Sequence, residues 1–193
     1  MAALLMLAAA MGRSRTLRDD LLRLPELIAD VLTAEEHIRA RVERFRYLQE
    51  CVVLGRGYNL ATAYELALKM RETSYVLAQP FASPDFVHGP IAMLAEGFPV
   101  IAFANHGATL PSVLDVIAQT QARGAEAVVI GNAPQALQIA DIAIQVNEGR
   151  DVPEVISPFP SIVAGQIFAW ALSLLKGFNP DHPRGLHKVT ITK

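Results

Sequence analysis

The chain has 193 residues, of which 52% are hydrophobic and 19% are charged, and its mean hydropathy is +0.29. These values exclude a disordered chain, which would be rich in charge and poor in apolar residues. The 17 Lys and Arg residues nearly balance the 19 Asp and Glu residues and form no basic cluster, so we expect no nucleic-acid partner. The single cysteine, Cys51, can form no disulfide within the chain, and we expect a reducing, cytoplasmic location.

The first 46 residues are predicted to form a helical arm. Residues 1–11 are apolar, but a bilayer-spanning helix takes ~20 apolar residues. They also lack the positive charges that precede the core of a signal peptide, so we expect the end of a helix and no membrane segment. Residues 15–46 repeat apolar side chains near helical spacing, with Thr33 and Glu36 placed as a helix N-cap and its capping box. We interpret this segment as a linker or packing arm.

From Cys51 onward, short apolar runs alternate with helical segments. The runs predict strands over residues 51–54, 99–104, 127–130 and 142–146. The periodic segments predict helices over residues 59–71, 110–123, 134–140 and 158–176, while the proline-rich residues 76–90 predict an irregular loop. Such alternation is typical of a parallel sheet that is covered on both faces. We therefore predict an α/β fold, a three-layer αβα sandwich with a parallel, flavodoxin-like sheet over residues 47–178, followed by a tail over 179–193.

Ligands in open parallel sheets bind at the carboxyl ends of the strands. Gly55, Arg56 and Gly57 follow the first predicted strand, where they could cradle an anion on backbone N–H groups or simply form a tight turn. A dinucleotide-binding motif would require a third glycine where Leu60 stands, so we expect neither NAD nor any other cofactor. The residues 76–90, 105–109 and 131–132 should lie at the same edge of the sheet.

Candidate acid–base and carbonyl-binding groups occur at three places. Glu65, Lys69 and Glu72 form one stripe on an otherwise apolar helix, either as an acid–base site at the ligand end of the sheet or as a surface ion ladder. His88 lies in the proline-rich loop, as a structural residue or as a group that titrates near neutrality. Lys188 in the tail is either a Schiff-base amine or a solvated charge. The five histidines lack the spacing of metal ligands, so no metal is expected.

Together these segments resemble the SIS (sugar isomerase) family. Within that family they are similar to the second of the two SIS domains of glucosamine-6-phosphate synthases and SIS-type glucosamine-6-phosphate deaminases. The resemblance covers essentially the whole chain and is carried by residues 52–57, 67–75, 86–93 and 181–190. The order of these segments, and the 16 positions from Glu72 to His88, make the combination specific.

The resemblance implies an aldose–ketose shift on a hexose 6-phosphate, with an amine added or released. It implies that Glu72 moves a proton between C1 and C2, that His88 of a dimer partner opens the sugar ring, and that Lys188 engages the ketose carbonyl. The expected ligand is a hexose 6-phosphate or aminohexose 6-phosphate, and the expected assembly is a homodimer or a larger homo-oligomer. The candidate substrate-binding residues are Gly55, Arg56, Gly57 and His187.

The chain departs from the family pattern in one large respect. The family's enzymes carry a first SIS domain with a phosphate loop rich in Ser and Thr, whereas residues 105–109 here have few hydroxyls. Residues 1–15 resemble the last helix of such a first domain, and residues 16–46 resemble the arm that joins the two. We expect no glutaminase domain either. We therefore expect half of a two-domain enzyme, with deaminase and synthase directions both open and a non-catalytic sugar-phosphate-binding module as the alternative.

Overall fold

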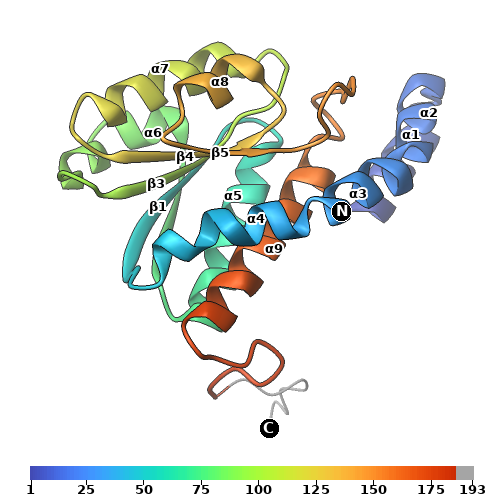
Figure 1. Cartoon of the computed structure of the whole chain (residues 1–193). Coiled ribbons are helices and arrows are strands. Elements are labelled where there is room, and N and C mark those ends of the chain that lie inside the picture. The colour runs from blue at the N-terminus through green and yellow to red at the C-terminus, as the bar shows by residue number, and fades with distance from the viewer. Residues whose placement is uncertain (186–193) are drawn as a thin grey trace, which may run out of the picture.

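The centre of the molecule is a parallel sheet of five strands (Figure 1). The computed structural model describes residues 1–185, and its strand order is β2-β1-β3-β4-β5. Every neighbouring pair of strands is parallel, so the predicted parallel α/β sheet is confirmed. The strands are β1 (Glu50–Gly55), β2 (Leu77–Ala82), β3 (Pro99–Phe103), β4 (Glu126–Gly131) and β5 (Ile142–Gln145).

Helices cover both faces of this sheet and complete the three predicted layers (Figure 1). One face carries α4 (Glu35–Val42), α5 (Asn59–Lys69) and α9 (Pro158–Leu175), and the other carries α6 (Ser83–Val87), α7 (Leu110–Gln121) and α8 (Pro134–Ile139). Successive strand residues point to opposite faces. Val53 accordingly joins the core beneath α5 and α9, whereas Val52 and Leu54 join the core beneath α7. Because both faces are buried, these strands are unbroken apolar runs in the sequence.

Residues 77–82 form strand β2, where the sequence predicted an irregular loop. This strand lies at the edge of the sheet and, within residues 1–185, pairs only with β1. Pro80, near its middle, has no N–H to donate, and proline is tolerated in sheets mainly on edge strands. The partial exposure of β2 and its proline together remove the apolar run that identifies the other strands. The rest of the predicted loop holds α6 and a short 3-10 turn, η3 (Pro90–Met93).

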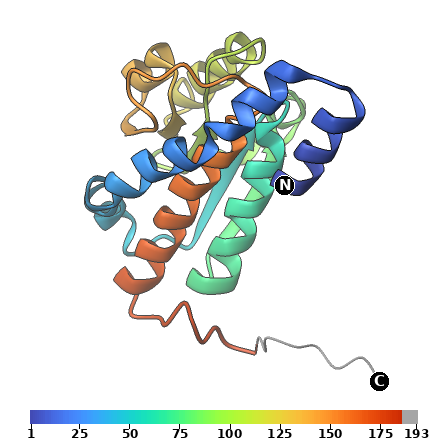
Figure 2. The ribbon, with the colours of Figure 1, turned by 90° about the vertical axis from the view of Figure 1, so that its right-hand side faces the viewer.

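The helical arm packs directly on the sheet domain. It consists of α1 (Ala2–Met11), α2 (Arg15–Leu22), α3 (Leu24–Thr33) and α4, and ends in a 3-10 turn, η1 (Glu43–Phe45). Helices α3 and α4 cross α9 (Figure 2), and Ile38 and Val42 share a core cluster with Phe168 of α9. Thr33 does not cap α4, because its hydroxyl donates to the Asp30 carbonyl and so closes α3 instead. Because Ile38 and Val42 are buried against α9, helix α4 is part of the core.

The chain enters and leaves the sheet domain at one place. Arg46, just after the arm, donates from Nη1 to the Leu175 carbonyl at 2.9 Å. In return, Lys176 donates from Nζ to the carbonyl of Leu48 at 2.7 Å and to that of Arg46 at 3.3 Å. These bonds tie the start of β1 to the end of α9.

The burial of the arm leads to a prediction about stability. Ile38 is 0% exposed, so Ile38→Ala is expected to lower the free energy of unfolding by ~2–5 kcal/mol, because it leaves a cavity between α4 and the core. Leu32→Ala is the control: Leu32 is 55% exposed on α3, and its loss should cost less than ~0.5 kcal/mol. Urea unfolding followed by circular dichroism measures both. Equal, small effects would contradict the placement of α4 in the core.

Helix α9 is long and apolar enough, by length and composition, to cross a membrane, and within residues 1–185 no other helix meets that test. In the structure it is 61% buried and packs against α3, α4 and α5. A helix that is covered on most sides needs no polar stripe. Its apolar composition is accounted for by this packing.

Candidate functional site

Glu72 lies in a π-helical turn, η2 (Met70–Ser74), that extends α5. Lys69 Nζ lies 2.7 Å from Glu72 Oε2 and 3.8 Å from Glu65 Oε1, so the predicted acidic stripe is a set of ion pairs on one helix face. About a third of each of these three side chains is exposed. The hydrogen bond to Glu72 raises the pKa of Lys69, which therefore stays charged throughout the neutral range.

Helix α9 holds this π-turn in place. Ser173 Oγ donates to the Thr73 carbonyl at 2.8 Å, and Ser74 Oγ donates to the Ala169 carbonyl at 3.3 Å. Thr73 Oγ1 donates to the Lys69 carbonyl at 2.8 Å. A π-turn breaks the regular helical hydrogen-bond pattern, and such turns are frequent at functional sites. The backbone around Glu72 is thus fixed by side chains of α9 and of the turn itself.

The chain after α9 returns to the segment that carries Glu72. Tyr75, three positions on, has left-handed backbone (φ 56°), and its hydroxyl accepts a hydrogen bond from the Arg184 backbone N–H at 2.8 Å. The Arg184 guanidinium stacks over the rings of Tyr75 (4.5 Å) and Phe178 (5.0 Å), which meet edge to face. The beginning of the tail is therefore docked on Tyr75, three positions after Glu72 in the sequence. His187 and Lys188 lie outside the described residues.

His88 lies far from Glu72 within one chain. It ends α6 with an exposed side chain, and its backbone N–H donates to the Asp85 carbonyl at 3.3 Å. Glu72 precedes β2 and His88 follows it, so the six residues of this strand, roughly 20 Å in length, separate them. The prediction that the acidic stripe lies at the ligand end of the sheet is wrong for Glu72. Helix α5 starts at the carboxyl end of β1 and runs back, which places Glu72 at the amino ends of the strands.

The turn after β1 has a steric reason for its glycines. A Cβ on Gly55 would lie 2.8 Å from the carbonyl carbon of Asn59, which is closer than real Cβ contacts allow. Gly57 has φ +57°, a conformation that favours glycine. The Asn59 side chain is buried behind the turn, where Nδ2 donates to Ser157 Oγ at 2.8 Å. Gly55 thus serves the close approach of α5 to β1, and Arg56 between the glycines is partly exposed.

A carboxylate occupies the next loop at the same edge of the sheet. Residues 105–109, here called the α7 loop, lead from β3 into α7. Glu154 accepts hydrogen bonds from the backbone N–H groups of Ala108 (2.9 Å) and Thr109 (3.2 Å) and from the Thr109 hydroxyl. Glu154 and Tyr75 are functional candidates that the sequence alone does not indicate. The contacts of both residues span long stretches of sequence, so no local pattern identifies them.

The sequence profile of the SIS domain family matches residues 49–175, about two thirds of the chain. The chain belongs to the SIS domain family. The matched SIS domain runs from β1 to the end of α9, so it contains Glu72, His88 and the α7 loop, while the arm precedes it.

The proteins that are similar to this SIS domain include isomerizing aminotransferases and solved structures with the same fold. A glutamine–fructose-6-phosphate aminotransferase [isomerizing] of Pyrococcus horikoshii is 37% identical over 166 residues, which cover 86% of this chain and 27% of that protein. The chain thus spans less than a third of that relative. The C-terminal domain of the Francisella tularensis glucosamine-fructose-6-phosphate aminotransferase has the same fold (TM-score 0.75, 23% identity), with 83% of this chain and 45% of that one covered. The Thermotoga maritima glucosamine-6-phosphate deaminase also shares the fold (TM-score 0.70, 20% identity; 99% and 55% covered).

Cys51 is a residue of the buried core. Cys51 is buried in β1, and burial raises its pKa to about 12. The thiol therefore stays protonated, and a thiolate is the nucleophilic form.

Proposed function

We propose that this SIS domain interconverts glucosamine 6-phosphate and fructose 6-phosphate, as the isomerizing half of a two-SIS enzyme. In the deaminating direction, His88 protonates the ring oxygen as the bond from C1 to that oxygen breaks, and the C1 hydroxyl loses its proton to water, which leaves the open-chain aldehyde. Glu72 then takes the proton from C2 while the C1 oxygen regains a proton from water. Glu72 returns its proton to C1, which leaves an imine at C2. Water adds to this imine, ammonia leaves, and the products are fructose 6-phosphate and ammonia. Lys188 engages the carbonyl at C2.

One observation carries this proposal. The Arg184 backbone is hydrogen-bonded to Tyr75, so the tail is anchored three positions from Glu72 and four positions before Lys188. An acid–base carboxylate and an amine from the tail can act on one sugar only if the tail returns to the carboxylate. This anchoring supports the joint role of Glu72 and Lys188.

The distance between Glu72 and His88 supports a second copy as the partner. Roughly 20 Å of strand separates the two residues within one chain. A general acid must come within hydrogen-bond reach of its proton acceptor. We therefore propose that His88 acts at the Glu72 of a neighbouring copy, and that the smallest active unit is a homodimer.

A second candidate is the synthase direction, in which ammonia adds to fructose 6-phosphate and the same residues run the shift in reverse. The name of the Pyrococcus horikoshii relative, at 37% identity, favours it. The two candidates share Glu72, His88 and Lys188. They differ in whether ammonia is released from the sugar or added to it.

Mixing two inactive variants tests the proposal. We expect the wild-type chain to release ammonia and fructose 6-phosphate from glucosamine 6-phosphate in equal amounts, and Glu72→Gln and His88→Ala each to lose this activity. Random exchange of subunits makes half of the dimers mixed, and each mixed dimer has one intact site, so the mixture should recover about a quarter of wild-type activity. A coupled ammonia assay measures it. A mixture that stays inactive beside an active wild type would contradict the shared site, and a wild type that neither binds nor converts the sugar at millimolar concentration would contradict the homodimer of this chain as the smallest active unit.

A further inference from the structure

Helix α1 is apolar on every side, yet most of its surface is exposed. Its ten residues include no polar side chain. The helix packs against α2, and Leu5 on its inner side joins the apolar cluster of Leu24 and Leu27. The other large side chains of α1, and the last one of α2, are each at least 55% exposed: Leu4, Met6, Leu7, Met11 and Leu22. A helix that is hydrophobic all round is normally a buried helix, and a large exposed apolar patch marks an interaction surface.

A groove beside α1 has the size and the lining to hold a helix of the same kind. Its volume is about 740 Å³, and it runs between α1, α2 and the start of α3. Its walls are mostly apolar and include Met6, Ala10, Leu21, Leu22, Ile28 and Phe159. A helix of ten residues is ~15 Å long and ~10 Å across, so the half that faces a groove fills roughly 600 Å³. The groove therefore matches the facing half of a helix such as α1.

The charges around the groove are complementary to charges on the same hairpin. Arg13, Arg15 and Arg18 lie along the groove, and residues 1–18 contain no acidic residue. Asp19 follows at once on α2; it is exposed and takes part in no ion pair in the part of the chain that the structure describes. Two copies of α2 that cross antiparallel about a two-fold axis would bring each Asp19 opposite the arginines of the other copy. This pairing would neutralise the rim of the groove.

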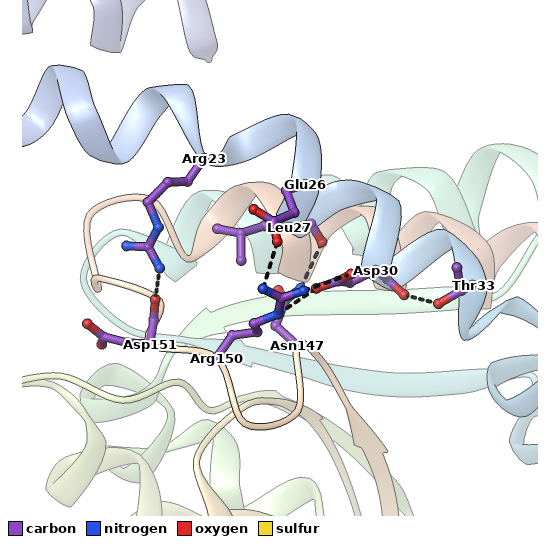
Figure 3. A network of polar contacts seen from close by, with 8 residues as sticks. All are labelled: Arg23, Glu26, Leu27, Asp30, Thr33, Asn147, Arg150 and Asp151. Carbon is purple, nitrogen blue, oxygen red and sulfur yellow. Dashed lines mark hydrogen bonds and ion pairs between the residues drawn. The ribbon is translucent and has the colours of Figure 1, made fainter.

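The groove belongs to a fixed part of the arm (Figure 3). Helix α3, which follows α2 directly, is tied to the loop between β5 and α9. Arg150 of that loop pairs with Glu26 (Nη1 to Oε1, 2.7 Å) and with Asp30 (Nε to Oδ2, 3.0 Å). Asn147 Nδ2 donates to the Leu27 carbonyl at 2.8 Å. These contacts hold α3 on the sheet domain, so the hairpin of α1 and α2 stands on a firm base.

We propose that the groove binds helix α1 of a second copy of this chain, and that a two-fold axis relates the two copies. Each α1 then lies in the groove of the other copy, and α1 and α2 of both copies form a four-helix bundle. A two-fold contact uses the same surface on both copies, so an apolar helix and an apolar groove occur together on one chain. The inference uses neither Glu72 nor His88. A chain that also makes the contact through His88 would form a tetramer, because two different two-fold contacts generate one.

Cross-linking at the groove tests this contact. The sequence has one cysteine, Cys51, which is buried, so an introduced cysteine carries the only accessible thiol. Ala10→Cys places a thiol at an exposed position of the groove, and a short bis-maleimide should convert most of this variant to a covalent dimer. Leu32→Cys is the control, because Leu32 is 55% exposed but lies outside the groove, and it should stay monomeric on a denaturing gel. The cross-link should form equally in a His88→Ala background, which separates this contact from the proposed active site.

Substitutions in the groove identify its occupant. Met6→Glu places a carboxylate at the contact and should raise the dissociation constant at least tenfold in sedimentation equilibrium; the fold should persist, because Met6 is 61% exposed. Arg18→Asp should also weaken the contact, and Arg18→Asp combined with Asp19→Arg should restore it, because the exchange keeps the charges complementary. A monomeric wild type would overturn the proposal, as would a dimer that Ala10→Cys does not cross-link and Met6→Glu does not weaken. A monomer that binds phosphatidylglycerol vesicles through α1 would overturn it too and would identify a membrane as the occupant.

Discussion

Glu72→Gln is expected to slow the exchange of the C1 proton of fructose 6-phosphate with solvent by ~10²–10⁴-fold, because positioned acid–base groups contribute about that much. The amide of Gln keeps the size of the side chain but cannot take up the proton. The fold should persist, because the carboxylate is partly exposed and its ion pair with Lys69 is worth at most ~1 kcal/mol. Deuterium incorporation at C1, followed by NMR in D₂O, measures the rate.

Glu65→Gln is the matched control for this variant. Glu65 also faces Lys69, at 3.8 Å, and is about as exposed as Glu72, but it lies two helical turns earlier on α5. It should retain near wild-type exchange. If both variants lose the same fraction of activity, the effect comes from the charge of the helix face, and Glu72 is not the base.

Gly55→Ala is expected to lower the free energy of unfolding by about 3 kcal/mol or more. The new methyl group would lie 2.8 Å from the Asn59 carbonyl carbon and 2.9 Å from Leu60 Cα. Both atoms belong to the backbone of α5, so no side-chain rotation relieves the contact. The helix would have to move away from β1, and the hydrogen bond from Asn59 to Ser157 would be disturbed with it.

Gly89→Ala supplies the comparison for this effect. A methyl group on Gly89 would meet no atom of the described residues within 4 Å beyond its chain neighbours. The replacement should therefore cost less than ~0.5 kcal/mol. Urea unfolding of both variants gives the difference. A Gly55→Ala protein as stable as Gly89→Ala would show that the turn after β1 adapts freely.

The fold could be predicted where burial leaves a run of apolar residues in the sequence. The runs around Val53, Ile101 and Val128 are apolar because both sheet faces are covered, and each proved to be a strand. The edge strand β2 has one neighbouring strand in the described part of the chain and contains Pro80, so its local sequence resembles a loop. The burial of Ile38 depends on α9, far along the chain, and the helical spacing of the arm indicates an apolar face but not its partner.

The candidate site could be predicted residue by residue but not in its arrangement. The motif segments single out Glu72 and His88, yet only the direction of α5 shows that the two lie at opposite ends of the sheet. Glu154 reaches the α7 loop across 45 positions of sequence, and its own neighbourhood carries no motif. Contacts of this kind arise from the tertiary fold.

The hydrogen bonds that join Arg46 and Leu48 to Leu175 and Lys176 have a consequence for modularity. Chain ends that lie side by side allow a unit to be inserted into a longer polypeptide, or circularly permuted, without distortion of its interior. The same geometry lets such a unit be duplicated in tandem by gene fusion, with only the connecting segment left to adapt.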